Sequence, residues 1–232
     1  MKYENIVKGR FIERPNRFIA KVEINGKEET VHVKNTGRCK ELLIPGTTVY
    51  LNLSDNPSRK TKYDLIAVEK LRKGKNKLLI NMDSQIPNSV AEEFLKSGVL
   101  FSKNAKIRRE VTYNKSRFDF YIEDCERKIF LEVKGCTLEN DGIASFPDAP
   151  TERGVKHINE LISCIENGFE AYILFVIQMK EIQLFKPNDT THKAFGDALR
   201  QAEKKGVKIL AFDCNVTHDS IKIDKEIRVE LW

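Results

Sequence analysis

Apolar and polar residues alternate along the first third of the chain, and this pattern predicts short β-strands. Asn25-Gly26 separates the second strand from the third, which is typical of a tight hairpin. Residues 35–46 are expected to form a turn with one or two helical turns. The predicted strands cover residues 6–13, 17–24, 29–35, 47–54, 63–71 and 77–82. Three strands, a short helix and further strands are the order of an OB-type barrel, although other small barrels share this pattern.

The pattern changes near residue 85, where longer amphipathic segments alternate with apolar strands. The expected helices are 86–98, which has Pro87 in its first turn and ends at Gly98, and also 151–167 and 190–206. The expected strands are 105–113, 117–124, 128–137, 171–178 and 207–214. This order predicts a mixed α/β domain over residues 84–232, after a β-barrel over residues 1–83. A helix-turn-helix assignment for 190–206 is disfavoured because a strand follows Gly206.

Composition narrows the class of protein. The 232 residues are 41% hydrophobic and 32% charged, and no apolar run reaches membrane-spanning length, so we expect a soluble, cytoplasmic protein. The five cysteines and four histidines are scattered without the spacings of zinc sites or a disulfide framework.

Positive charge is concentrated in two windows. Residues 56–77 contain eight Lys/Arg against two Asp/Glu, and residues 103–117 contain six against one, although the whole chain carries only +6. Such clusters favour DNA as a partner, because basic side chains neutralise phosphates and release counterions. The candidate phosphate contacts in these windows are Arg59, Lys60, Lys62, Arg108, Arg109 and Arg117.

Three charged residues stand in the apolar strands RFDFYIED and KIFLEVKG. Asp119 alternates with Phe118 and Phe120 and should therefore point away from both, while Glu132 and Lys134 share one face of their strand. Adjacent strands can bring Asp119, Glu132 and Lys134 together.

Two interpretations of this cluster remain open. It is either a structural ion cluster neutralised by Lys134, or two carboxylates that hold Mg²⁺ or Mn²⁺ beside a catalytic ammonium. Glu92 and Glu93 could supply a further carboxylate, or could belong to a solvated helix face.

The helix over 151–167 follows the carboxylate strands. Arg153, Lys156 and His157 lie opposite its apolar stripe and could bind phosphate, although a solvated polar face also explains them. Asp148 could cap this helix.

Several longer runs carry a family resemblance. RFDFYIE, LEVKGCTL and FPDAPTERGVKHINEL, together with HVKNTGRCKELL and SDNPSRKTKYDL, closely resemble the sugar fermentation stimulation protein A family over essentially the whole chain. The resemblance implies an N-terminal OB-like barrel and a PD-(D/E)XK, restriction-endonuclease-like domain in which Asp119, Glu132 and Lys134 match the signature. Phe118 stands where that signature has proline. It also implies DNA binding and a regulatory role in sugar metabolism.

The resulting hypothesis is a two-domain DNA-binding protein with a nuclease site. Asp119 and Glu132 would hold Mg²⁺ or Mn²⁺, Lys134 would orient the attacking water, and Arg153 and Lys156 would hold phosphate. The alternatives are a non-catalytic, largely sequence-independent DNA-binding regulator of sugar metabolism, and a sugar-binding module.

Overall fold

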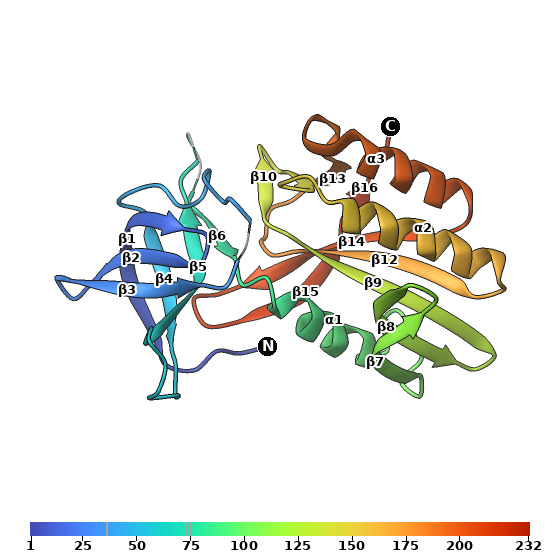
Figure 1. Ribbon diagram of the computed structural model, residues 1–232, viewed down its shortest axis with the longest axis horizontal. Coiled ribbons are helices and arrows are strands. Elements are labelled where there is room, and N and C mark those ends of the chain that lie inside the picture. The colour runs from blue at the N-terminus through green and yellow to red at the C-terminus, as the bar shows by residue number, and fades with distance from the viewer. Residues whose placement is uncertain (36, 73, 75) are drawn as a thin grey trace.

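The computed structural model describes residues 1–35, 37–72, 74 and 76–232, which form two lobes side by side (Figure 1). The first lobe is a six-stranded sheet in the order β3-β2-β1-β4-β5-β6, and pairing of β3 with β5 closes its first five strands into a barrel. Its strands are β1 (Ile6–Asn16), β2 (Ile19–Ile24), β3 (Lys27–Val33), β4 (Thr48–Leu53), β5 (Tyr63–Lys70) and β6 (Leu78–Asn81). The predicted OB-like barrel is confirmed.

Local sequence explains the barrel. Ala20, Val22 and Ile24 alternate with more exposed residues along β2 and fill the interior. Asn25 and Gly26 both have positive φ, 51° and 77°, as a two-residue hairpin turn requires. Between β3 and β4 no α-helix is assigned in the described residues. The described residues there form two short turns, at 40–42 and 45–46, and Leu42 and Leu43 donate to the carbonyl of Cys39 in the first, so the expected helical segment is shorter than predicted.

The second lobe is built on a mixed six-stranded sheet in the order β15-β14-β12-β9-β8-β7. Its helices are α1 (Ile86–Lys96), α2 (Glu152–Glu166) and α3 (Asp189–Lys204). The sheet strands are β7 (Lys106–Tyr113), β8 (Ser116–Asp124), β9 (Arg127–Cys136), β12 (Glu170–Ile177), β14 (Lys208–Val216) and β15 (Ile221–Glu226). Helix α1 covers one face, while α2 and α3 cover the other, and separate apolar cores fill the two interfaces (Figure 1).

A second, four-stranded sheet was not predicted. It has the order β10-β11-β13-β16 and consists of β10 (Leu138–Asn140), β11 (Ile143–Phe146), β13 (Leu184–Pro187) and β16 (Arg228–Val229). These strands are two to four residues long, which is too short for alternation to be recognised.

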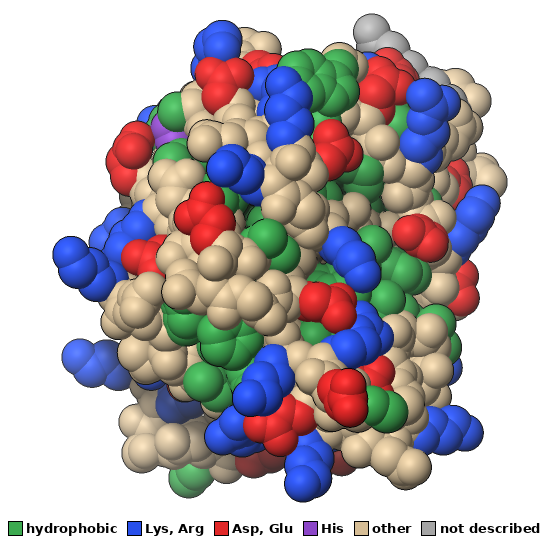
Figure 2. Space-filling view, turned by 90° about the vertical axis from the view of Figure 1, so that its right-hand side faces the viewer, with side chains coloured by type: hydrophobic (Ala, Val, Ile, Leu, Met, Phe, Trp, Pro, Cys, Tyr) green, Lys and Arg blue, Asp and Glu red, His purple; other side chains and the backbone are tan. Residues whose placement is uncertain are grey.

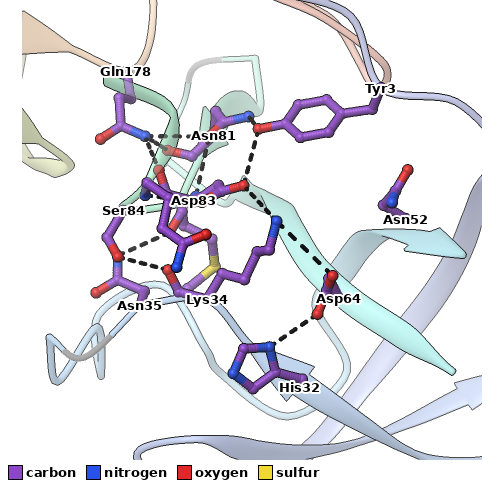
Figure 3. Close-up of polar contacts among 12 residues, drawn as sticks. Tyr3, His32, Lys34, Asn35, Asn52, Asp64, Asn81, Asp83, Ser84 and Gln178 are labelled. Carbon is purple, nitrogen blue, oxygen red and sulfur yellow. Dashed lines mark hydrogen bonds and ion pairs between the residues drawn. The ribbon is translucent and has the colours of Figure 1, made fainter. Parts of the chain in front are cut away.

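The two lobes meet at a buried polar junction (Figure 3). Gln178, which follows β12, donates from Nε2 to the Asn81 carbonyl at 3.1 Å and to the Asp83 carbonyl at 3.0 Å. Lys34 lies between Asp64 and Asp83, at 3.9 and 3.3 Å from their carboxylates. This junction fixes the end of β6 against the C-terminal end of β12.

The first three residues also connect the lobes. The amino group of Met1 bonds Glu93 of α1 at 2.6 Å and the carbonyl of Ile221, and the Tyr3 amide donates to the carbonyl of Asp219. They therefore precede the barrel but lie against the second lobe. Among the described residues, no helix combines the length and apolar character needed to cross a membrane.

Candidate active site

Asp119 and Glu132 lie next to each other where the β8–β9 ladder ends. The last paired residues are Phe120 and Leu131, so the next position along the same register would place Asp119 opposite Glu132. Instead of continuing the ladder, the Val133 amide donates to Asp119 Oδ2 at 2.8 Å. Asn88, in the first turn of α1, donates to Asp119 Oδ1 at 2.7 Å. The Asp119 carboxylate is therefore fixed by one neighbouring strand, β9, and one helix, α1.

Glu132 is 3% exposed and is held from two sides. Lys134, two residues along the same face of β9, and His157 of α2 both contact its Oε1 oxygen, the latter through Nδ1 at 2.5 Å. The other oxygen, Oε2, is buried and has no hydrogen-bond partner in the described part of the chain. Buried carboxylate oxygens are normally satisfied, so this oxygen is available to a ligand.

The two carboxylates have opposite pKa shifts. Burial, and next the nearby charge of Glu132, raise the pKa of Asp119, against the hydrogen bond from Val133 and the charge of Lys134. Burial would also raise the pKa of Glu132, but the hydrogen bond from His157 and the charge of Lys134 lower it below its ordinary value. Two carboxylates in one buried site repel each other, so a further cation would stabilise both in their charged form.

The donor set fits a hard divalent ion. Asp119 and Glu132 supply carboxylate oxygens, and Mg²⁺ or Mn²⁺ commonly takes one or two such groups and keeps several waters. No group of three or more His, Cys, Asp or Glu positioned for a metal is found in the described residues, so the fit rests on these two carboxylates.

The suggestion of a further carboxylate from α1 is wrong. Glu92 pairs with Lys96 and with Arg109 at 2.9 Å, and Glu93 pairs with the N-terminal amino group. Both carboxylates are therefore paired with cationic groups outside the candidate active site.

Strict alternation fails at Asp119. Phe118 packs in the core beneath α2, whereas Phe120 packs in the core beneath α1, so the side chains change faces at this point. Opposite Asp119 on β7, Glu110 has φ of 53°, which interrupts the regular pleat. The prediction that Asp119 points away from both phenylalanines is therefore wrong, because the two rings lie on opposite faces of the sheet.

His157 differs from its predicted position. His157 is 6% exposed and its ring contacts Glu132, so the assignment to a solvated, phosphate-binding face is wrong. Arg153 and Lys156 are exposed as expected, and Lys156 lies in a surface hollow of α2 beside Lys115. The helix cap is Thr151, which accepts from Gly154, while Asp148 instead faces Gly37 of the barrel.

Most of the predicted phosphate-binding arginines are paired with acids. Arg59 makes two hydrogen bonds to Asp64, and the arginines of the second window pair with Glu123, Glu92 and Glu110. Arg108 lies over Tyr121 on one side of the sheet and Arg109 over Phe120 on the other, so they do not form one patch. Lys60 and Lys62 are exposed and form no ion pair with a described residue. Figure 2 shows basic and acidic side chains interspersed on the face of the second lobe.

A basic site on the barrel was not predicted from the sequence. Arg14, Arg17, Arg38 and Lys40 line one hollow, and Arg14 donates to four backbone carbonyls of the surrounding loops. Arg14 lies in β1, Arg17 lies in the turn after it, and Arg38 and Lys40 lie in the loop after β3, so no window of high charge density marks them. Asn88 was also missed, because only its contact with Asp119 distinguishes it from a helix-start residue.

Comparison with known proteins follows the same division of the chain. Residues 12–76 match the SfsA N-terminal OB domain, and residues 85–220 match the sugar fermentation stimulation protein RE domain. A sugar fermentation stimulation protein homolog of Desulfitobacterium hafniense is 62% identical over 231 residues, covering 100% of this chain and 99% of that protein. A homolog of the same description from Clostridium beijerinckii is 58% identical over 231 residues and covers 100% of both chains.

A solved structure is similar over the same length. The structure of Pyrococcus furiosus SfsA in complex with Ca²⁺ has a TM-score of 0.83 and 29% identity, and covers 99% of this chain and 98% of its own. The similarity extends through both lobes.

Proposed function

The chain belongs to the sugar fermentation stimulation protein family, and from this premise we propose that it is a DNA-binding protein with a divalent-metal-dependent phosphodiesterase site. One observation carries the proposal: the buried Oε2 of Glu132 has no partner among the described residues, yet it lies in a site shared with the carboxylate of Asp119. A purely structural ion cluster would leave no buried charged oxygen unsatisfied. The Ca²⁺ complex of the Pyrococcus furiosus protein supports a divalent ion as ligand.

Each side chain has a role in this proposal. Asp119 and Glu132 would hold Mg²⁺ or Mn²⁺, which when bound polarises a phosphate and lowers the pKa of water. Asn88 and the Val133 amide hold Asp119 in place, and His157 holds Glu132. The Lys134 ammonium would orient the attacking water and stabilise negative charge on the phosphate. Arg153 and Lys156 are exposed at the start of α2 and would contact the DNA backbone.

The second candidate is a non-catalytic DNA-binding regulator of sugar metabolism. The contact of Lys134 with Glu132 favours it, because that pair alone could neutralise one carboxylate. Removing Lys134 distinguishes the two functions.

The test combines calorimetric titration of Mg²⁺ and Mn²⁺ with cleavage of single-stranded, duplex and branched DNA. Asp119→Ala and Glu132→Ala should each abolish metal uptake and cleavage. Lys134→Ala should retain metal uptake but lose cleavage by about a hundredfold or more, because its role is in the reaction. Lys128→Ala, on the exposed start of the same strand, is the matched control and should behave as wild type. Wild-type protein that binds DNA but takes up no metal would favour the non-catalytic regulator.

A further inference from the structure

Two hollows meet at Gly37 and lead from the barrel to the candidate active site. The first is the basic hollow of Arg14, Arg17, Arg38 and Lys40, and Gly37 lines it too. Gly37 also lines a second hollow of about 230 Å³ between the lobes, whose opposite wall includes Gly135. Gly135 follows Lys134 directly in β9, so this second hollow reaches the strand that carries the active-site lysine.

The charges of the two hollows differ. Arg17, Arg38 and Lys40 are exposed and make no ion pair with a described residue, unlike the arginines of the charge-dense windows. The interlobe hollow is lined mainly by uncharged polar groups such as Thr137, and Asp148 is the charged side chain in its lining. A basic surface suits phosphates, whereas hydroxyl, amide and carboxylate groups suit the edges of bases.

The dimensions favour one strand over two. A hollow of about 230 Å³ has the volume of only several water molecules, which leaves room for a base but not for stacked base pairs. Both glycines in the lining pack closely against a neighbouring side chain, and neither position has room for a side chain: a Cβ on Gly37 would lie 2.3 Å from Asp148 Oδ2, and one on Gly135 would lie 2.6 Å from Gln178 Oε1. Phe18 is 45% exposed beside Arg17, which lines the basic hollow, and offers a stacking surface.

We infer that the protein binds single-stranded DNA along a path from the basic hollow of the barrel, past Gly37, through the interlobe hollow to Lys134. This inference deepens the proposed function. It rests on that function because cleavage of the bound strand requires the proposed phosphodiesterase site. The barrel residues hold phosphates, and the interlobe hollow accepts unpaired bases, so a duplex must open or end before its strand reaches the active site.

Binding is measured first, with an oligothymidine and a duplex of equal length, by fluorescence anisotropy in chelator so that no cleavage occurs. Arg38→Glu with Lys40→Glu should weaken single-strand binding by about tenfold or more and lower the slope of log affinity against log salt by about 1.4, which is about 0.7 for each lost phosphate contact. Arg38→Glu is compared singly with Lys27→Glu, an equal charge reversal at the β2–β3 hairpin, which should change affinity by less than about twofold. Equal losses in both single variants, or preference for the duplex, would overturn the inference.

The route is tested second. Thr137→Trp should obstruct the interlobe hollow, keeping single-strand affinity within about threefold while reducing cleavage by about tenfold or more. Thr190→Trp, the same change at an exposed position of α3 that lines neither hollow, should match wild type. Iodouracil-substituted DNA should photo-crosslink to residues 135–148 of the wild-type protein whether or not it is cleaved. Cleavage by wild type with full activity in Thr137→Trp, or no crosslink in this segment, refutes the route. Crosslinking and binding without cleavage would instead refute the nuclease proposal alone.

Discussion

At the scale of single residues, the raised pKa of Asp119 has a direct consequence for stability. Burial and then the charge of Glu132 favour the protonated carboxyl in the folded, metal-free protein. The stabilisation from the protonated Asp119 carboxyl is fully present below the ordinary pKa of aspartate, about 3.9. It is lost as pH rises through the raised pKa of Asp119 in the folded protein. Asp119→Asn removes the charge at similar volume. In chelator at about pH 7, we therefore expect the variant to have a higher free energy of unfolding than wild type, with the difference shrinking toward about pH 4.

Urea unfolding across this pH range checks the expectation, and Mg²⁺ provides the control. The ion should stabilise wild type but not Asp119→Asn, because ligands stabilise only the folded state that binds them. A variant less stable than wild type at about pH 7 would mean that hydrogen bonds to Asp119 outweigh its repulsion from Glu132.

The sequence predicted part of this site. Two-residue spacing placed Glu132 and Lys134 on one face, and strand pairing brought Asp119 to them. The contact of His157 with Glu132 was not predicted, because His157 was assigned with Arg153 and Lys156 to the polar face of its helix and nothing in the pattern marks it as buried. That no described residue bonds Oε2 of Glu132 depends on side-chain packing and has no signal in the sequence.

At the scale of elements, Gly135 sets how closely β9 can approach its neighbours. A Cβ there would lie 2.6 Å from Pro87 Cγ at the start of α1 and 2.6 Å from Gln178 Oε1. Gly135→Ala must therefore move α1 or the end of β12, and we expect a loss of about 1–3 kcal/mol of stability. Lys128→Ala, exposed on the same strand, should change stability by less than about 0.5 kcal/mol.

Chemical unfolding of both variants measures this difference. Comparable stability of Gly135→Ala and wild type would show that α1 or the end of β12 can move without loss of stability. The glycine would then not be required for packing. The long strands and helices around Gly135 were predictable because each repeats its apolar pattern over eight or more residues, whereas β10 and β16 have too few residues for any pattern.

At the scale of the whole molecule, charge density along the chain did not predict where positive charge is available on the surface. Arg108 and Arg109 are adjacent in sequence, yet they lie over opposite faces of the sheet and pair with Glu123 and Glu92. Arg17 and Arg38 are distant in sequence, yet they line one hollow. Ion pairing and loop packing, which determine this outcome, arise only in the folded chain.

The two lobes should unfold together because they share both a core and a polar junction. Their buried apolar residues form one contiguous cluster from the barrel to the layer under α2 and α3. Gln178, 1% exposed, donates to the Asn81 and Asp83 carbonyls. Gln178→Leu keeps the volume but leaves these buried acceptors without that donor, which should cost about 1–3 kcal/mol.

Hydrogen exchange measured on peptides from β5 and β12 tests this coupling. In wild type, amides of both strands should exchange with the same free energy, since both open only on global unfolding. In Gln178→Leu, β5 should exchange at a lower free energy than β12, because the barrel can then open while the second lobe stays folded. Gln201→Leu, an equivalent change at an exposed position of α3, should leave the two strands matched. Wild-type strands that already differ would show that the barrel is an independent folding unit, and the junction would then orient the lobes without coupling their stability.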